Sequence, residues 1–461
     1  MAERKRGTGR IARSGRIARS TKLGGVAASH AVRTLGTRAA NVVRTDEAGQ
    51  EAIGRQAIET AERLVTVLGT MKGAAMKLGQ TFSVIDVGMV PEEHREEFQR
   101  KLAKLQASAE PHPVKEIRRV VEQDLGQRLS AVFADFSQEP IAAASIGQVH
   151  RATLQDGRDV AVKVQYPGIK EAVKADLQNL GLALKLLARI SPGLDTKEIA
   201  QEVRERITEE LDYELEASNQ RAVARRYRGH PFMVVPDVVS ELCRERVIVS
   251  DFVEGARFEQ ITGLPPAERS RLGEIMARFY VNGPMRHRLL NGDPHPGNSL
   301  FLADGRVAFV DFGFFKQLSR PEAELQRDVL IAVHQRDDDR LFELMRDAGV
   351  LTGRSERDLE QLMEVYDTLC GWLFVDEEVT IAPNIVTKAI VQQGRMSRSE
   401  VRLPASQIVA ARAYVLVLAI LGQLEARNNW SRIAREMLYD EPPVTDLGRA
   451  EAEWLGGLGL R

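Results

Sequence analysis

The sequence predicts an α+β fold of two unequal lobes, preceded by a helical extension. Two apolar runs, 149–152 and 160–164, flank Asp156-Gly157, and an Asp-Gly pair between such runs is a strong signal for a β-hairpin. From residue 321 onward the apolar residues recur at helical spacing between charged ones. The sequence therefore indicates a small β-containing lobe followed by a larger helical lobe.

Four segments are expected along the chain. Residues 1–45 form a basic arm, 46–110 a helical extension, 111–255 the small lobe and 256–461 the helical lobe. The Pro-rich stretch 111–113 marks the start of the small lobe, because proline ends helices.

The expected elements of the lobes follow from periodicity and from breakers. In chain order they are a helix over 114–125, the strand hairpin, an apolar helix near 180–190, a long amphipathic helix from 197 to about 228, strands within 231–236 and 247–255, and helices beyond Ser319-Arg320-Pro321.

Composition narrows the class of protein. The 461 residues carry a formal net charge of −1 and are 43% hydrophobic, which suits a globular chain long enough for two lobes. A balanced charge gives no indication of nucleic-acid binding. Cys243 and Cys370 are the two cysteines, which form neither a disulfide framework nor a metal-ligand pattern and suit a reducing compartment.

The arm is the one strongly charged segment. Residues 1–45 contain eleven Lys and Arg and a single acid, Glu3. Such a segment is too basic and too rich in glycine for a secretory signal. It reads as a solvated arm, or as a surface for anionic lipid headgroups. Nucleic acid ranks third, because no aromatic residue in the arm offers a stacking surface.

A long apolar stretch, 408–422, is expected to be a buried helix. Arg412 interrupts it, and a membrane-spanning helix needs about 20 apolar residues. We therefore expect a cytoplasmic protein with no transmembrane segment, peripheral at the inner face of a membrane if the arm binds lipid.

Two aspartates eighteen positions apart carry the chemical signal. Asp293 lies in N-G-D-P-H-P-G-N, with Asn298 five residues later, and Asp311 opens D-F-G. Protein-kinase-like phosphotransferases use this order: an aspartate that orients the acceptor, an asparagine that holds metal, and a second metal-binding aspartate. A Pro/Gly turn followed by an incidental acid would explain either half but not the pair.

The upstream hairpin supplies the matching lysine and a loop. Lys163 ends V-A-V-K, the strand signature of a lysine that binds the α- and β-phosphates. Residues 141–149 read like a glycine-rich phosphate loop in which only Gly147 remains. The predicted nucleotide-binding residues are Ala142, Ala143, Ala144, Ser145, Gly147, Val149, Ala161 and Lys163.

A glutamate should pair with this lysine. Glu202, Glu205 and Glu209 share one face of the long predicted helix, so the partner of Lys163 is expected among them. Glu210 and Asp212 stand two apart, and on a regular helix they would point roughly 200° away from each other. Either one of them faces the cleft, or the helix is distorted there.

Four motifs together resemble the UbiB/AarF-type atypical kinases. They are Lys77-Leu78-Gly79-Gln80, the alanine-rich loop 142–145, Glu210-Leu211-Asp212 and the G-D-P-H-P-G-N loop. The resemblance covers about residues 60–320. One departure is Asn291, where many relatives carry histidine.

The resemblance implies a bilobal protein-kinase-like fold with a family-specific N-terminal helical extension. That extension would carry Lys77 and Gln80, which share a helical face, into the cleft; a tightly packed helix pair is the alternative. The cofactors implied are ATP (or ADP) and Mg²⁺, with Asn298 and Asp311 as metal ligands and Asp293 and Lys163 as catalytic residues. A quinone precursor or lipid is the implied ligand, with membrane contact through the arm or residues 69–80 and no nucleic acid.

Three functions remain open on the sequence. The first is an ATP-dependent atypical kinase or ATPase that supports isoprenoid-quinone (ubiquinone) or lipid metabolism. The second is a small-molecule phosphotransferase of the aminoglycoside or choline kinase type, which generally lacks the K-x-G-Q, alanine-loop and E-x-D motifs. The third is a nucleotide-switched scaffold without turnover. The A-P-E motif that closes a peptide-docking segment is missing after Asp311, which disfavours peptide substrates.

The arm makes a first prediction. Deleting residues 1–45 should remove most of the binding to vesicles containing anionic lipid, because each Lys or Arg near such a surface contributes about 1 kcal/mol. Cosedimentation of the full and shortened chains measures this, and binding by the full chain should weaken as salt is raised. Neutral vesicles are the control. Equal binding by both chains would place the membrane surface elsewhere, first of all on residues 69–80.

Overall fold

The computed structural model describes residues 111–144, 146–175, 177, 201, 204, 208–351, 356–386, 388 and 405–459. These residues fall in two compact units. One contains residues 111–117, 142–148 and the described part of 165–211. The other contains 118–141, 149–164 and 212–459. The predicted arm and helical extension lie outside the described residues, so the four-part organisation stays a prediction.

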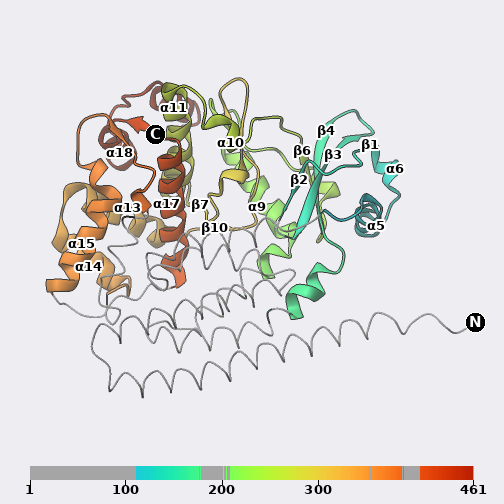
Figure 1. Cartoon of the computed structure of the whole chain (residues 1–461), viewed down its shortest axis with the longest axis horizontal. Helices are drawn as coiled ribbons and strands as arrows, with labels where there is room; N and C mark the ends of the chain where they lie inside the picture. Colours follow the sequence, from blue (N-terminus) through green and yellow to red (C-terminus); the bar gives the residue numbers. More distant parts are fainter. Residues whose placement is uncertain are drawn as a thin grey trace, which may run out of the picture. The chain divides into compact units, whose positions relative to one another are not determined.

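The predicted hairpin is the centre of a five-stranded sheet. β3 (Gly147–Leu154) and β4 (Asp159–Gln165) lie side by side in the strand order β1-β3-β4-β6, and β2 (Ala142–Ala143) pairs with β3 (Figure 1). β1 is Phe133–Phe136 and β6 is Val247–Asp251. Gly157 takes φ +89° at the turn, which explains the glycine there. The hairpin prediction is confirmed.

The sheet has one buried and one partly open face. Val160, Val162 and Val164 are fully buried on β4, whereas Ala161 and Lys163 alternate with them and are only partly buried. β6 pairs antiparallel with β4 and sets Lys163 opposite Ile248. The alternation is what a strand with one packed face requires, and it places Lys163 on the open face. Two helices precede the sheet, α5 (Val114–Leu125), as predicted, and α6 (Leu129–Val132).

Short strands hold the loops of the helical lobe. β8 (Ser299–Phe301) and β9 (Val307–Phe309) are antiparallel, and β7 (Leu289–Asn291) pairs with β10 (Phe315–Gln317). β5 (Met233–Val234) runs parallel to β9. We expected 231–236 in the sheet of the small lobe, and this is wrong. Prolines at 231 and 236 limit the segment to a two-residue strand, because proline cannot donate to a ladder.

Most of the other regular elements are helices. They are α9 (Tyr213–Arg226), η1 (Ser240–Leu242), α10 (Phe258–Ile261), α11 (Pro266–Ala277), the π-helical turn η2 (Arg278–Asn282), α12 (Gly283–His287), η3 (Pro296–Asn298), α13 (Arg320–Gln335), α14 (Asp338–Asp347), α15 (Glu356–Cys370), η4 (Gly371–Leu373), α17 (Ala405–Gln423), α18 (Trp430–Tyr439) and α19 (Asp446–Gly457). A two-stranded ribbon, β11 (Val379–Thr380) with β12 (Arg427–Asn428), interrupts them. The mixed fold, with its sheet in the N-terminal part and helices in the C-terminal part, matches the predicted class.

The apolar stretch lies within α17, as expected, and its residues 409–422 are buried or partly buried. α17 lies beside α11 (Figure 1), and Val417, Ile420 and Leu421 belong to the main hydrophobic core. No helix in the described part of the chain is long and apolar enough to cross a membrane.

The long helix expected over 197–228 is interrupted. The backbone turns at Leu211, and α9 starts at Tyr213 with Asp212 as its N-cap. The Asp212 side chain accepts a hydrogen bond from the backbone N–H of Leu215 at 3.0 Å, as aspartate does at helix starts. The predicted distortion at Glu210-Leu211-Asp212 is thus a helix break.

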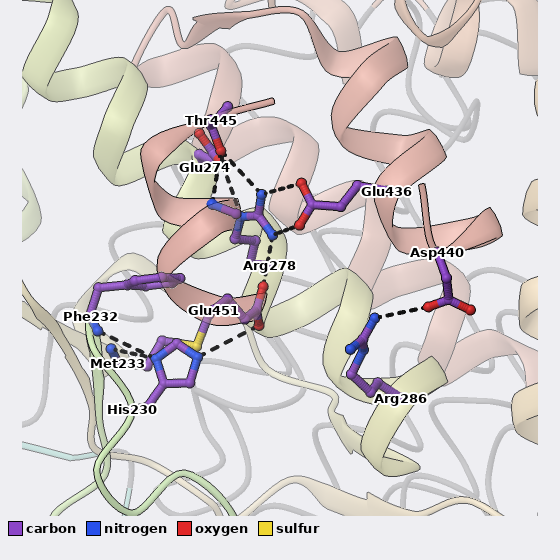
Figure 2. A network of polar contacts seen from close by, with 11 residues as sticks. His230, Phe232, Met233, Glu274, Arg278, Arg286, Glu436, Asp440, Thr445 and Glu451 are labelled. Atoms are coloured by element: carbon purple, nitrogen blue, oxygen red, sulfur yellow. Dashed lines mark hydrogen bonds and ion pairs between the residues drawn. The ribbon is translucent and has the colours of Figure 1, made fainter. Parts of the chain in front are cut away.

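A buried ionic network ties three helices together (Figure 2). Arg278, with no exposed side-chain surface, donates to Glu274 on α11 (Nε to Oε1, 2.8 Å), to Glu436 on α18 (Nη1 to Oε1, 2.8 Å) and to Glu451 on α19 (Nη1 to Oε2, 2.7 Å). Thr445 Oγ1 donates to Glu274 at 2.6 Å. Every donor of a buried arginine must be satisfied, and the three carboxylates together with the Thr445 hydroxyl, which accepts from Nη2 at 3.3 Å, provide this.

The network also reaches β5. His230 Nδ1 accepts the backbone N–H of Met233 at 3.2 Å, and its Nε2 lies 3.6 Å from Glu451 (Figure 2). Burial would raise the pKa of Glu451, but the contact with His230 and the charge of Arg278 outweigh it and hold that pKa below its ordinary value. The strand beside β9 is therefore tied to the C-terminal helix α19.

Arg278→Met should destabilise the protein by about 3 to 5 kcal/mol, because it leaves three carboxylates buried without their cation. Equilibrium urea denaturation followed by tryptophan fluorescence measures the loss, and Trp454 on α19 is a local probe. Arg320→Met is the control, since the Arg320 side chain is 83% exposed in its ion pair with Glu324, and it should change stability by less than about 0.5 kcal/mol. Equal effects would mean that the network contributes no net stability.

Candidate functional site

Lys163 joins two carboxylates from distant parts of the chain. Its Nζ lies 2.6 Å from Glu216 Oε1 on α9 and 3.2 Å from Asp311 Oδ2 after β9. The side chain of Lys163 is 17% exposed and that of Glu216 is 4% exposed. Burial would lower the pKa of Lys163, but the charges of Asp311 and Glu216 outweigh it and raise the pKa well above the ordinary value. Lys163 is therefore a charged group held in a fixed place.

Glu216 corrects the predicted partner of the lysine. We expected Glu202, Glu205 or Glu209; the first two lie outside the described residues, and the structure pairs Lys163 with Glu216 instead. The physical reason is the helix break at Asp212. Residues on one face of a continuous helix no longer share a face once the helix ends and a new one begins at Tyr213. Glu216 is the fourth residue of α9, so its side chain comes from the first turn after the cap. The signal available in the sequence was the N-cap itself, Asp212, four residues before Glu216.

Asp311 is held on both carboxylate oxygens. The backbone N–H of Gly313 donates to Oδ1 at 3.0 Å, and Lys163 meets Oδ2. Phe312 is fully buried in the main core, and Asn219 on α9 donates to its carbonyl at 3.3 Å. The predicted metal ligand thus has a defined orientation on the same helix–strand frame as Lys163.

The loop that carries Asp293 is connected to Asp311 through Asn291. The Asn291 amide donates to the carbonyl of Asp311 at 2.9 Å, and its Oδ1 accepts the backbone N–H of Asp293 at 3.0 Å. Asn298 closes the other side, since its Nδ2 donates to the carbonyl of Asp293 at 3.0 Å. The departure noted at Asn291 therefore links the two loops, and the structure brings Asp293, Asn298, Asp311 and Lys163 together.

Sequence reasoning missed a fifth charged group, Arg412. Its Nη2 lies 3.2 Å from Asp293 Oδ1, with side chains 10% and 8% exposed. The sequence analysis used Arg412 only as evidence against a membrane-spanning helix, because it interrupts an apolar stretch. A lone arginine in an otherwise apolar helix was the available signal, because a buried cation needs an acidic partner.

The predicted nucleotide loop forms part of the sheet. Ala142 and Ala143 make β2, the Ala144 N–H donates to the carbonyl of Gly147 at 2.8 Å, and Gly147 begins β3. Ser145 lies outside the described residues. Val149 and Ala161 share the face of Lys163, because Arg151 and Asp159 on the same strands form an ion pair on that face.

The two acids of the E-x-D motif have different surroundings. Asp212 is exposed and caps α9, and Glu210 is half-buried before the break. Lys77 and Gln80 lie outside the described residues. The approach of the helical extension to the cleft accordingly stays a prediction.

The donor set fits a magnesium ion that also binds phosphate. The Nδ2 of Asn298 donates to the carbonyl of Asp293, so its Oδ1 and the Asp311 carboxylate are the hard oxygen donors that the two motifs offer to a metal. The described residues contain no group of three or more acidic, His or Cys side chains that could hold a metal unaided. Mg²⁺ is commonly bound by one or two carboxylates, with phosphates and water completing the shell.

The lysine–glutamate pair and the Asp-Asn-Asp order on a mixed fold define a protein-kinase-like domain. The sequence model of the ABC1 atypical kinase-like domain matches residues 104–345. The chain belongs to this family, whose relatives include the COQ8 and AarF-domain atypical kinases of the UbiB group. The resemblance read from the motifs is confirmed.

Several relatives show the extent of the match. "Atypical kinase COQ8B, mitochondrial" of Rattus norvegicus is 33% identical over 294 residues, 64% of this chain and 55% of the relative. "Protein ACTIVITY OF BC1 COMPLEX KINASE 8, chloroplastic" of Arabidopsis thaliana is 32% identical over 60% of this chain and 37% of its own length. The chain thus spans about half or less of these curated relatives.

A solved structure agrees on the fold. Rv3197 from Mycobacterium tuberculosis, determined in complex with erythromycin, matches with a TM-score of 0.62 and 33% identity, covering 85% of this chain and all of that one.

Glu216→Gln should weaken nucleotide binding about tenfold or more, because Lys163 loses the charged acceptor that fixes it, an interaction of about 1.5 to 3 kcal/mol. Thermal shift against Mg-ATP concentration measures the affinity. Glu209→Gln tests the originally expected partner, and Glu214→Gln on the exposed side of α9 controls for charge; both should bind as the unaltered protein does. A loss with Glu209→Gln and none with Glu216→Gln would reverse the assignment.

Proposed function

We propose that this protein is a Mg-ATP-dependent atypical kinase or ATPase of the UbiB type that supports isoprenoid-quinone or lipid metabolism. The observation that carries the proposal is Lys163, in contact with both Glu216 and Asp311. That arrangement is the one in which a kinase lysine can hold nucleotide phosphates next to the metal-binding aspartate. A surface lysine would not be buried between two carboxylates.

Each residue has a role in this proposal. Lys163 binds the α- and β-phosphates and Glu216 holds its ammonium group in place. Asp311 and Asn298 would hold Mg²⁺, which supplies neutralisation of the phosphate charge when bound. Asp293 orients the acceptor and takes its proton. The phosphate contacts expected of residues 142–147 stay a prediction.

The segment between Asp311 and α13 is short, which favours a small phosphoryl acceptor or water. Only β10 intervenes before the helix begins at Arg320, where Ser319 and Glu322 form a capping box. A peptide-binding kinase needs a long segment at this point, ending in A-P-E. The alanines at 142 and 144 restrict the backbone where the usual loop has glycines. Both features support acceptors smaller than a protein.

The printed names of relatives support the metabolic assignment. COQ8B of rat and coq-8 of Caenorhabditis elegans are named mitochondrial atypical kinases, and we extend the association with ubiquinone biosynthesis to this chain as a proposal. A quinone precursor or lipid is the proposed ligand. We propose a cytoplasmic location with peripheral membrane contact through the basic arm or residues 69–80, and no nucleic-acid partner.

Asp311→Asn should abolish Mg²⁺-dependent nucleotide binding and lower phosphate release at least about 100-fold, because it removes the carboxylate devoted to the metal. Thermal shift with Mg-ATP, and phosphate release with and without quinone-like lipids, measure both effects. Asp304→Asn is the matched control, since Asp304 is an exposed loop aspartate paired with Arg306. Lys163→Ala should weaken the phosphate contact in the same assay. Unchanged Mg-ATP stabilisation in both Asp311→Asn and Lys163→Ala would refute the site; binding without any phosphate release or transfer would leave the scaffold function instead.

A further inference from the structure

We propose that Arg412 is a positioning residue for Asp293, and this rests on the proposed phosphoryl-transfer function. Arg412 comes from α17, more than a hundred residues after the catalytic loop. Its Nη2 lies 3.2 Å from Asp293 Oδ1. The guanidinium would fix the direction in which the carboxylate faces the acceptor.

Burial makes this contact strong enough to hold a side chain. The Arg412 and Asp293 side chains are 10% and 8% exposed, so little water screens them. A charge pair in such a place orients both partners, and removing one of them leaves the other unpaired. Surface ion pairs, by contrast, hold geometry weakly.

Arg412 is itself fixed from the other side. Its guanidinium carbon lies 5.5 Å from the centroid of the Phe314 ring, within the range of a cation–π contact. Phe314 is buried in a cluster with Leu290 and with Val409 of the preceding turn of α17. The arginine is therefore held by the residue that directly follows D-F-G.

The backbone of the catalytic loop lies directly against the same cluster. Gly292 donates its N–H to the carbonyl of Phe314 at 2.8 Å. A Cβ at Gly292 would lie 2.7 Å from Phe314 and 2.9 Å from Val409, too close for any side chain. The close approach brings α17 near enough for Arg412 to reach Asp293.

Asp293 is thus held in two independent ways. Asn291 and Asn298 bind its backbone N–H and carbonyl, which sets the position of the residue. Arg412 binds the carboxylate, which sets its rotation. Arginine suits the task better than lysine because its planar guanidinium is always charged and fixes a direction.

The test separates positioning from a merely structural role. In Arg412→Ala of the full chain, kcat for Mg-ATP turnover should fall about 10- to 100-fold, as expected for a misdirected catalytic group. KM for ATP should stay within about threefold, because the nucleotide contacts are elsewhere. Methylguanidinium in solution should restore part of the lost kcat, and Arg412→Lys should recover less than the arginine does.

Arg269→Ala is the matched control. Arg269 is a 15% exposed arginine on α11 that donates to the carbonyl of Leu424, just beyond the other end of α17. It should leave kcat and the response to methylguanidinium unchanged. An unchanged kcat in Arg412→Ala would overturn the proposal. So would a loss of activity that comes from a higher KM for ATP and that methylguanidinium does not restore.

A measurement without turnover distinguishes this proposal from the proposed function. Thermal unfolding of Arg412→Met, Asp293→Asn and the double variant tests the pair directly. If the pair acts as described, the double variant unfolds at a midpoint no lower than Arg412→Met alone. Additive losses would overturn the positioning role, whereas a coupled pair in a protein that neither binds nor hydrolyses ATP would contradict the proposed function only.

Discussion

The contact of Lys163 with Glu216 and Asp311 is the interaction on which the candidate site depends. Each partner comes from a different element: β4, the first turn of α9 and the loop after β9. A lysine buried to this degree loses hydration, and only opposite charges close by can offset the loss. The strand, the helix and the loop must therefore hold a common geometry whenever the ammonium group is charged.

The loops that carry Asp293 and Asp311 are joined by hydrogen bonds to their backbone. Asn291 spans from the carbonyl of Asp311 to the N–H of Asp293, and Asn298 returns to the carbonyl of Asp293. Amide side chains suit this role because they both donate and accept. The aspartate carboxylates meet ionic partners from other elements: Lys163 on β4 contacts Asp311, and Arg412 on α17 contacts Asp293.

Features that depend on residues close in sequence could be predicted, whereas contacts between residues far apart in sequence could not. The Asp156-Gly157 turn, the helix 114–125 and the helix that begins at 319–321 depend on neighbours in sequence, and the structure has each of them. The pairing of β5 with β9 depends on residues more than seventy positions apart. Glu216 and Arg412 were missed for the same reason: a helix break redirected one helical face, and only packing of α17 against the loop of Asp293 brings the arginine to that aspartate.

The break before α9 also resolves the geometry of the E-x-D motif. On a continuous helix Glu210 and Asp212 could not serve one centre, because residues two apart diverge. Here the helix ends before Asp212, and that carboxylate accepts the N–H of Leu215. An N-cap of this kind contributes about 1 kcal/mol to the helix it starts, and the first turn of that helix carries Glu216. Asp212 therefore fixes the start of α9, the helix whose first turn carries the partner of Lys163.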